Sequence, residues 1–140
     1  MLTGAELAAA RDDQPGSLRR RTPRRRSGDV RPQQGEVYWA DPDPTRGPEQ
    51  AKPRPFAIVS VDQLNSAPLG LSLAVPLTRT DFGSPLHLAI PAGEGGLKAR
   101  SFAMPEQLRT LSHQRLRRRL GNLRPKTLEE LLKRCWVLLR

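Results

Sequence analysis

The chain has a single cysteine, Cys135, among its 140 residues. One thiol excludes a disulfide within the chain, and no cluster of Cys and His residues has metal-ligand spacing, so we expect no structural metal and no other cofactor. A chain of this length buries about two thirds of its unfolded surface, which is sufficient for one stable domain without a disulfide or a structural metal. A reducing compartment is the simplest interpretation, and we expect the protein to be cytoplasmic.

Long hydrophobic runs are also absent. No apolar segment approaches the length of a membrane span, and no apolar core follows a basic segment at the N-terminus. We therefore expect neither a membrane anchor nor export.

Acidic residues are too few to balance the basic ones. The sequence has 14 Asp and Glu against 24 Lys and Arg, which gives a net charge of +10. Basic side chains that neutralise phosphates release condensed counterions, so this excess predicts a polyanionic partner. Aromatic residues make up only 4% of the sequence, so stacking on aromatic rings cannot dominate such an interaction.

Large apolar residues are scarce before residue 35. Segment 1–34 is rich in Pro, Gly, Ser and Arg, with Arg19–Arg21 and Arg24–Arg26 on either side of Pro23. These arginines repel one another and offer no face to bury, so we predict that 1–34 is a disordered basic arm. Eight basic and four acidic residues in this arm leave +6 of the net charge to 35–140, the predicted folded domain.

Short apolar segments separated by Pro- and Gly-rich turns follow Gly35. Alternation of apolar and polar residues predicts strands, and a continuous apolar run after Pro55 is typical of a strand buried on both faces. The predicted strands are Glu36–Ala40, Phe56–Val61, Leu71–Leu77, Leu86–Ile90 and, with weaker patterns, Lys98–Met104 and Arg119–Leu123.

The apolar period changes at the C-terminus. In Thr127–Leu139, leucines and Cys135 recur at helical spacing and form one stripe, with charged residues on the other side. Pro125 suits the first turn of such a helix. The predicted fold class is mainly β with a C-terminal helix, in the form of a small curled sheet closed by that helix.

The segment Asp41–Pro55 separates the first two predicted strands and is too long for a hairpin turn. Segments of this kind are usually functional or disordered. This one concentrates the polar and charged residues Arg46, Glu49, Gln50, Lys52 and Arg54. The residues alone leave two interpretations equally open, a functional loop and a solvated proline-rich connector.

Three motifs in order resemble the MazF/PemK family of toxin ribonucleases. The first runs from Gly35-Glu-Val-Tyr-Trp to Gln50 and continues in Arg54-Pro55; the second is Val75-Pro-Leu-Thr78; the third is Glu106-Gln-Leu-Arg-Thr110. The resemblance covers the chain from Gln34 to Arg140. It implies an SH3-like small barrel of the kind that CcdB and PemK toxins share, and a toxin domain over residues 35–140.

The resemblance also implies a function. The protein would be the toxin of a type II toxin–antitoxin system, a homodimer blocked by a cognate acidic antitoxin. It would cleave single-stranded RNA, including mRNA, at short sequences without a metal ion and so inhibit translation and growth. The 2′-hydroxyl would attack the adjacent phosphate and leave a 2′,3′-cyclic phosphate and a 5′-hydroxyl.

Three catalytic residues follow from the resemblance: Arg54, Thr78 and Glu49. An arginine stays protonated and can bind two phosphate oxygens, so Arg54 suits stabilisation of phosphorane charge better than general-base catalysis. The Thr78 hydroxyl would donate to a non-bridging oxygen or hold the sugar. Glu49 would accept the 2′-hydroxyl proton or order Arg54, and the general base stays open.

Further positions match RNA contacts of the family. Glutamate and glutamine side chains can bind base edges, and a histidine can stack on a base, although a histidine placed like His87, on the polar side of a strand, is more often a solvated surface residue. Basic side chains of the loop would follow phosphates. The candidate RNA-binding residues are Pro48, Gln50, Lys52, Arg46, His87, Ser101, Glu106 and Gln107.

Two other functions remain open. A gyrase-poisoning toxin of the same fold would bind a protein and would not need Arg54 or Thr78. Such toxins depend on a Trp-Gly-Ile ending, which Leu138-Leu-Arg140 lacks. The other is a basic barrel that binds RNA without cleaving it.

Overall fold

The structure is a computed structural model that describes residues 31–42 and 52–139. The predicted arm, 1–34, lies almost wholly outside these residues. No helix within the described ranges is long and apolar enough to cross a membrane.

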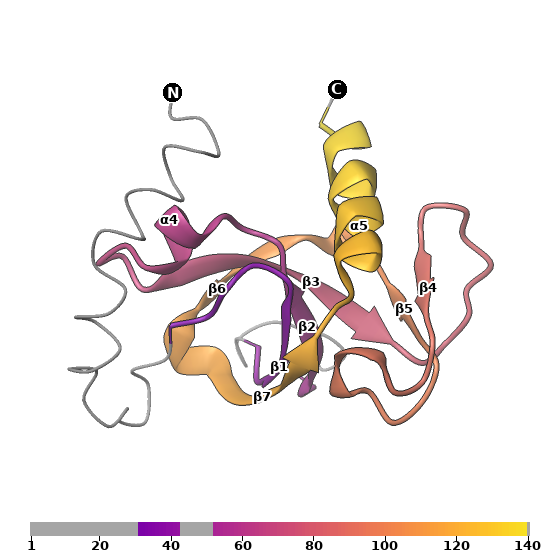
Figure 1. The fold of residues 1–140 in the computed structure, drawn as a ribbon, viewed down its shortest axis with the longest axis horizontal. Helices are drawn as coiled ribbons and strands as arrows, with labels where there is room; N and C mark the ends of the chain where they lie inside the picture. Colours follow the sequence, from indigo (N-terminus) through magenta and orange to yellow (C-terminus); the bar gives the residue numbers. More distant parts are fainter. Residues whose placement is uncertain (1–30, 43–51, 140) are drawn as a thin grey trace.

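Within the described residues, seven antiparallel strands and one long helix make up the fold, arranged as Figure 1 shows. The strand order is β4-β5-β3-β2-β1-β7, and β6 pairs with the first half of β3 while β5 pairs with its end. The strands are β1 Glu36–Ala40, β2 Arg54–Ile58, β3 Leu71–Thr78, β4 Leu88–Ile90, β5 Ser101–Ala103, β6 Arg109–Ser112 and β7 Leu116–Asn122. The helices are α4 Asp62–Asn65 and α5 Pro125–Val137, and the 3-10 turns are η1 Glu94–Gly96, η2 Pro105–Gln107 and η3 His113–Arg115.

The predicted fold class is confirmed, although the barrel is not closed. In the described part of the chain, the strand path ends on β4 at one side and on β7 at the other. Strand β6 was not predicted, because its four residues are too short to show an alternating pattern. The basic segment His113–Arg119 consists of the 3-10 turn η3 followed by the first residues of strand β7.

Strand β2 lies in the middle of the sheet and contributes to two hydrophobic clusters. Phe56 and Ile58 pack in one cluster with side chains of β1, β3, β6 and β7. Ala57 and Val59 point to the other face and pack in a second cluster. The continuous apolar run is therefore explained by burial on both faces, as the sequence predicted.

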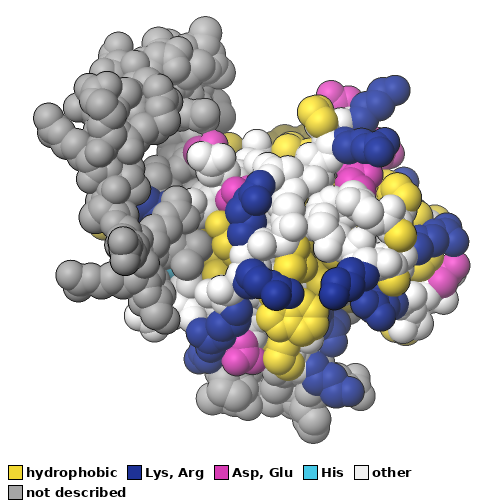
Figure 2. Space-filling model, turned by 60° about the horizontal axis from the view of Figure 1, so that its bottom comes forward, with side chains coloured by type: hydrophobic (Ala, Val, Ile, Leu, Met, Phe, Trp, Pro, Cys, Tyr) yellow, Lys and Arg dark blue, Asp and Glu magenta, His cyan; other side chains and the backbone are white. Residues whose placement is uncertain are grey.

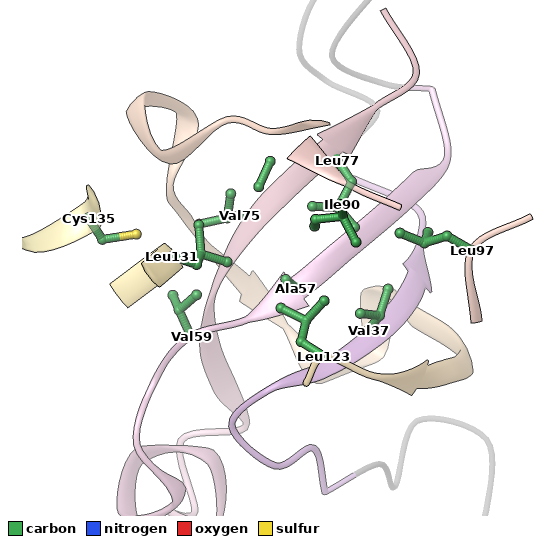
Figure 3. Close-up of a cluster of buried hydrophobic side chains, with 11 residues drawn as sticks. Val37, Ala57, Val59, Val75, Leu77, Ile90, Leu97, Leu123, Leu131 and Cys135 are labelled. Carbon is green, nitrogen blue, oxygen red and sulfur yellow. The ribbon is translucent and has the colours of Figure 1, made fainter. Parts of the chain in front are cut away.

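Helix α5 covers the second cluster (Figure 3). Leu131 and Cys135 point from the helix toward side chains of the sheet, including Val59 and Val75. Burial raises the pKa of the Cys135 thiol, so this residue packs as a small apolar side chain. The predicted apolar stripe is thus the face that packs on the sheet.

A close backbone approach places the turn η1 against β7. Gly96 has a positive φ of 73°, and a Cβ at this position would lie 1.9 Å from the Leu120 carbonyl oxygen. A Cβ on Gly121 would lie 2.7 Å from the backbone of η1. Only glycine fits at both positions. This contact brings Lys98, just after the turn, to the groove that also includes Arg118 of β7.

Candidate active site

The ends of β2 and β3 bring two predicted catalytic residues together. Arg54 is the first residue of β2, and Thr78 is the last residue of β3. The strands are antiparallel with Phe56 opposite Pro76, and Arg54 and Thr78 each lie two residues beyond this pair, at the same end of the two strands. Because both residues line the same two grooves, the guanidinium and the hydroxyl can act on the same phosphate.

Arg54 and Thr78 line a groove of about 780 Å³, which we call groove 1. Phe56 and Pro76, the adjacent pair on the same face of the sheet, line it as well. Among the described residues, its charged side chains are all basic. They are Lys52, Arg54 and Arg109.

A second groove of about 790 Å³, groove 2, shares Arg54 and Thr78 with the first. It also includes Trp39, whose ring is partly exposed and which lies opposite Arg118 in the β1–β7 pairing. Its charged lining in the described ranges is again entirely basic, consisting of Lys52, Arg54, Arg79, Lys98 and Arg118. Arg54 and Thr78 therefore lie where two positively charged grooves meet.

Basic side chains are also prominent at the surface. On the face that Figure 2 shows, Lys and Arg side chains surround a central apolar patch. Cations arranged around exposed apolar surface are typical of sites for single-stranded nucleic acid, where the charges bind phosphates and the apolar groups contact bases.

The Thr78 hydroxyl has a defined orientation. Its Oγ1 accepts a hydrogen bond of 3.1 Å from the backbone N–H of Thr80. Because the hydroxyl oxygen is the acceptor in this bond, its own hydrogen can be donated to a ligand. A donor beside an arginine is suited to a non-bridging phosphate oxygen.

The turn η2 carries Glu106 and Gln107, and both are exposed. Gln107 lines groove 1, whereas the Glu106 carboxylate lies 2.7 Å from Nε2 of His87. The His87 side chain is only 6% exposed. Stacking of a base on His87 would require its ring to leave this position, and its RNA contact stays a prediction.

The other described candidates lie at the grooves. Lys52 is exposed and lines both grooves. Ser101 lines groove 2 but is buried, and its hydroxyl donates a hydrogen bond of 3.0 Å to the Ala99 carbonyl. The candidates Arg46, Pro48, Glu49 and Gln50 lie outside the described residues.

Several groove residues were missed from the sequence. Trp39 and Arg109 had a signal, since they belong to the first and third motifs. Phe82, Lys98 and Arg118 had no local signal, because they come from three separate segments that only the fold brings together. In the described ranges, no three His, Cys, Asp or Glu side chains form a group that could hold a metal ion.

Comparison with known proteins agrees with this geometry. Residues 33–138 match the family model of the PemK-like, MazF-like toxin of type II toxin–antitoxin systems. The endoribonuclease toxin MazF of Escherichia coli is 31% identical over 81 residues, which is 58% of this chain and 68% of that protein. The endoribonuclease EndoA of Bacillus subtilis is 32% identical over 90 residues, 64% of this chain and 78% of that protein.

A solved structure extends the likeness to the fold. The crystal structure of MazF from Deinococcus radiodurans has a TM-score of 0.67 and 26% sequence identity, and the match covers 79% of this chain and 98% of that chain. Residues 33–138, which the family model matches, include both strands that carry Arg54 and Thr78. The chain therefore belongs to the PemK-like, MazF-like family of type II toxins.

Proposed function

We propose that the protein is an endoribonuclease that cleaves single-stranded RNA where the two grooves meet. The observation that carries this proposal is the placement of Arg54 and Thr78 together where two grooves meet, whose described charged residues are all basic. Membership of the toxin family and the names of its relatives support the same activity.

The chemistry needs charge stabilisation and a path for two protons. The 2′-oxygen forms a bond to phosphorus while the bond from phosphorus to the 5′-oxygen breaks, and the phosphorane carries extra negative charge. Arg54 binds two phosphate oxygens, and the Thr78 hydroxyl donates to one of them. Glu49 is the proposed acceptor of the 2′-hydroxyl proton, and the leaving 5′-oxygen takes its proton from solvent water. The products are a 2′,3′-cyclic phosphate and a 5′-hydroxyl.

Binding of the RNA strand is assigned to the surrounding side chains. Lys52 lines both grooves, so it can bind phosphate on either side of the cleaved bond. Gln107 lies in groove 1, where its amide can bind a base edge. Arg46, Pro48, Gln50 and Ser101 remain proposed contacts from the motif match.

The proposed biological setting is that of the family. The protein acts in the cytoplasm as a homodimer, and a cognate antitoxin with acidic segments blocks the basic grooves. Residues 35–140 form the toxin domain, and 1–34 form a basic arm that precedes it. Cleavage of mRNA then stops translation and growth.

The test is cleavage of RNA by the purified full-length chain in the presence of a chelator, followed by sequencing of the RNA ends. We expect cuts at a short recurring sequence, with cyclic phosphate and 5′-hydroxyl ends. Arg54→Ala should reduce cleavage by about 10²-fold or more and keep the fold. Lys126→Ala, which removes one exposed charge from α5, is the charge-matched control and should cleave normally.

The same variant separates the rival functions. If Arg54→Ala still arrests growth, the target is a protein, and the gyrase-poisoning function is favoured. If the wild-type chain binds RNA and leaves it intact, the enzyme proposal is wrong.

A further inference from the structure

Phe82 is an exposed aromatic residue at the active site that no motif identified. Its side chain is 64% exposed, and it lines groove 1 together with Arg54 and Thr78. The ring comes from the connection between β3 and β4, which contains no regular secondary structure. An exposed ring on such a connection can act in binding only if the connection is held in place.

Hydrogen bonds within the connection fix its course. The Asp81 carboxylate accepts a bond of 2.8 Å from the Gly83 N–H, and the Ser84 hydroxyl accepts one of 3.2 Å from the Leu86 N–H. The His87 N–H donates to the Ser84 carbonyl at 3.2 Å. Phe82 therefore sits on a tight turn whose polar groups are paired on both sides of it.

Two long-range contacts anchor the same turn. From α5, Nη1 of Arg134 donates hydrogen bonds of 2.9 Å to the carbonyls of Pro85 and His87. From η2, the Glu106 carboxylate lies 2.7 Å from Nε2 of His87. Because a carboxylate accepts, Nε2 carries a hydrogen and donates it. The turn is thus attached to both the helix and the motif segment that carries Gln107.

His87 also contacts the aromatic ring itself. The rings of Phe82 and His87 meet edge to face, with centroids 6.1 Å apart and an angle of 83° between their planes. This is a favourable aromatic geometry, and it leaves a face of Phe82 available to another ring. The His87 side chain is almost fully covered by protein, so its ring can support the exposed ring of Phe82.

We propose that Phe82 is the base-stacking residue of groove 1, and that His87 positions it while Glu106 and Arg134 hold His87 in place. This inference rests on the proposed function. RNA is favoured over a protein partner because the ring shares its groove with Lys52, Arg54 and Arg109. Sites that bind single-stranded nucleic acids combine an aromatic face for a base with cations for the phosphates, as this groove does.

The first experiment measures cleavage kinetics and base stacking separately. Phe82→Ala should raise KM for RNA by about 10-fold to 100-fold, the usual effect of losing one stacked base. Phe82→Trp should retain a KM close to that of the wild type. Phe82→Leu keeps an apolar side chain but no ring, and it should behave like Phe82→Ala. Leu69→Ala, which removes an equally exposed apolar side chain at the turn before β3, is the matched control.

Binding without cleavage provides a direct readout of stacking. In the Arg54→Ala background, an RNA that carries 2-aminopurine beside the cleavage site should lose fluorescence on binding, and Phe82→Ala should abolish this quenching. If the wild-type chain cleaves RNA but Phe82→Ala and Phe82→Leu match it in KM and quenching, the inference is wrong while the proposed function stands. Unchanged RNA kinetics with weakened self-association or antitoxin binding would make Phe82 a protein contact instead.

The positioning role of His87 has its own test. His87→Ala should raise KM and leave kcat nearly unchanged, and the double variant with Phe82→Ala should be no worse than Phe82→Ala alone. His87→Gln can still donate to Glu106 and should restore part of the lost affinity. Additive effects in the double variant, or a loss confined to kcat, would overturn the positioning role. Thermal unfolding checks that each variant is folded.

Discussion

Strand β3 has polar side chains near both of its ends, and the two ends satisfy them in different ways. At the beginning, Ser72 is fully buried, and its hydroxyl donates 2.7 Å to Asn65 and lies 2.9 Å from Nε2 of His113. At the other end, Thr78 is only half-buried and lines both grooves. Six residues separate Ser72 from Thr78, which is about 20 Å along a strand.

The comparison shows that residue types alone do not identify a site. Serine, histidine and asparagine are common in active sites, and they gather at the beginning of β3 with Ser60 as a further member. Their polar atoms bond to one another and to the backbone, including the Leu73 N–H, so this cluster holds the chain together. At the end of β3, the Thr78 hydroxyl instead lies at two open grooves beside several cations, so a ligand can reach it.

The largest expected effect is on stability and concerns the beginning of β3, where the buried polar cluster lies. Asn65→Ala should lower the free energy of unfolding by about 2–3 kcal/mol, because buried hydrogen-bonding groups of Ser60 and Ser72 lose their partner. Denaturant unfolding measures this loss. At temperatures where the variant is folded, kcat for RNA should stay within about twofold of the wild type. A large fall in kcat without loss of stability would give this end a direct role in function.

A smaller effect, on kcat, is expected at the end of β3 that lines the two grooves. Thr78→Val keeps the branched shape but removes the hydroxyl, so kcat should fall by about tenfold or more while stability changes by less than about 0.5 kcal/mol. Thr78→Ser should recover most of the activity. Thr127→Val, on helix α5 and outside both grooves, is the control. Loss of stability equal to that of Asn65→Ala would remove the contrast between the two ends.

The smallest expected effect concerns Cys135, a nucleophilic side chain that belongs to neither end. Burial raises the pKa of its thiol, so less thiolate is present at a given pH than in the unfolded chain. Alkylation by iodoacetamide at pH 8 should be slow in the native protein, become faster as the pH rises, and be fastest in denaturant. Mass spectrometry measures the rates. Equal rates in the native and unfolded chains would show that the thiol is accessible.

Much of the fold could be predicted because the relevant patterns are local. Alternation identified β1 within its observed bounds, and the stripe of leucines identified α5 to within a turn. The predicted strand bounds were less accurate where residues next to a strand form a turn. Leu86 and His87 belong to the turn before β4, because the His87 N–H bonds to Ser84 and not to a neighbouring strand.

The candidate site was predicted in part. Arg54 and Thr78 belong to motifs that are contiguous in sequence, so the resemblance of these motifs to the toxin family was enough to select them. Phe82 lies between motifs, and its proposed role depends on a ring contact with His87, which in turn bonds to Glu106 and Arg134. These three residues lie 5, 24 and 52 positions after Phe82. No local pattern reports a contact of that kind.

The sequence by itself determined most of the strands, the terminal helix and the basic charge, because each depends on residue type and short-range spacing. The two residues at the centre of the proposed chemistry followed from the resemblance of short motifs to a toxin family. Only the tertiary structure decided that Arg54 and Thr78 line the same two grooves, that the His87 side chain is largely covered and His113 is bonded to Ser72, and that the strand path of the described residues does not close into a barrel. These depend on strand register and burial, which are fixed by packing between segments far apart in the chain.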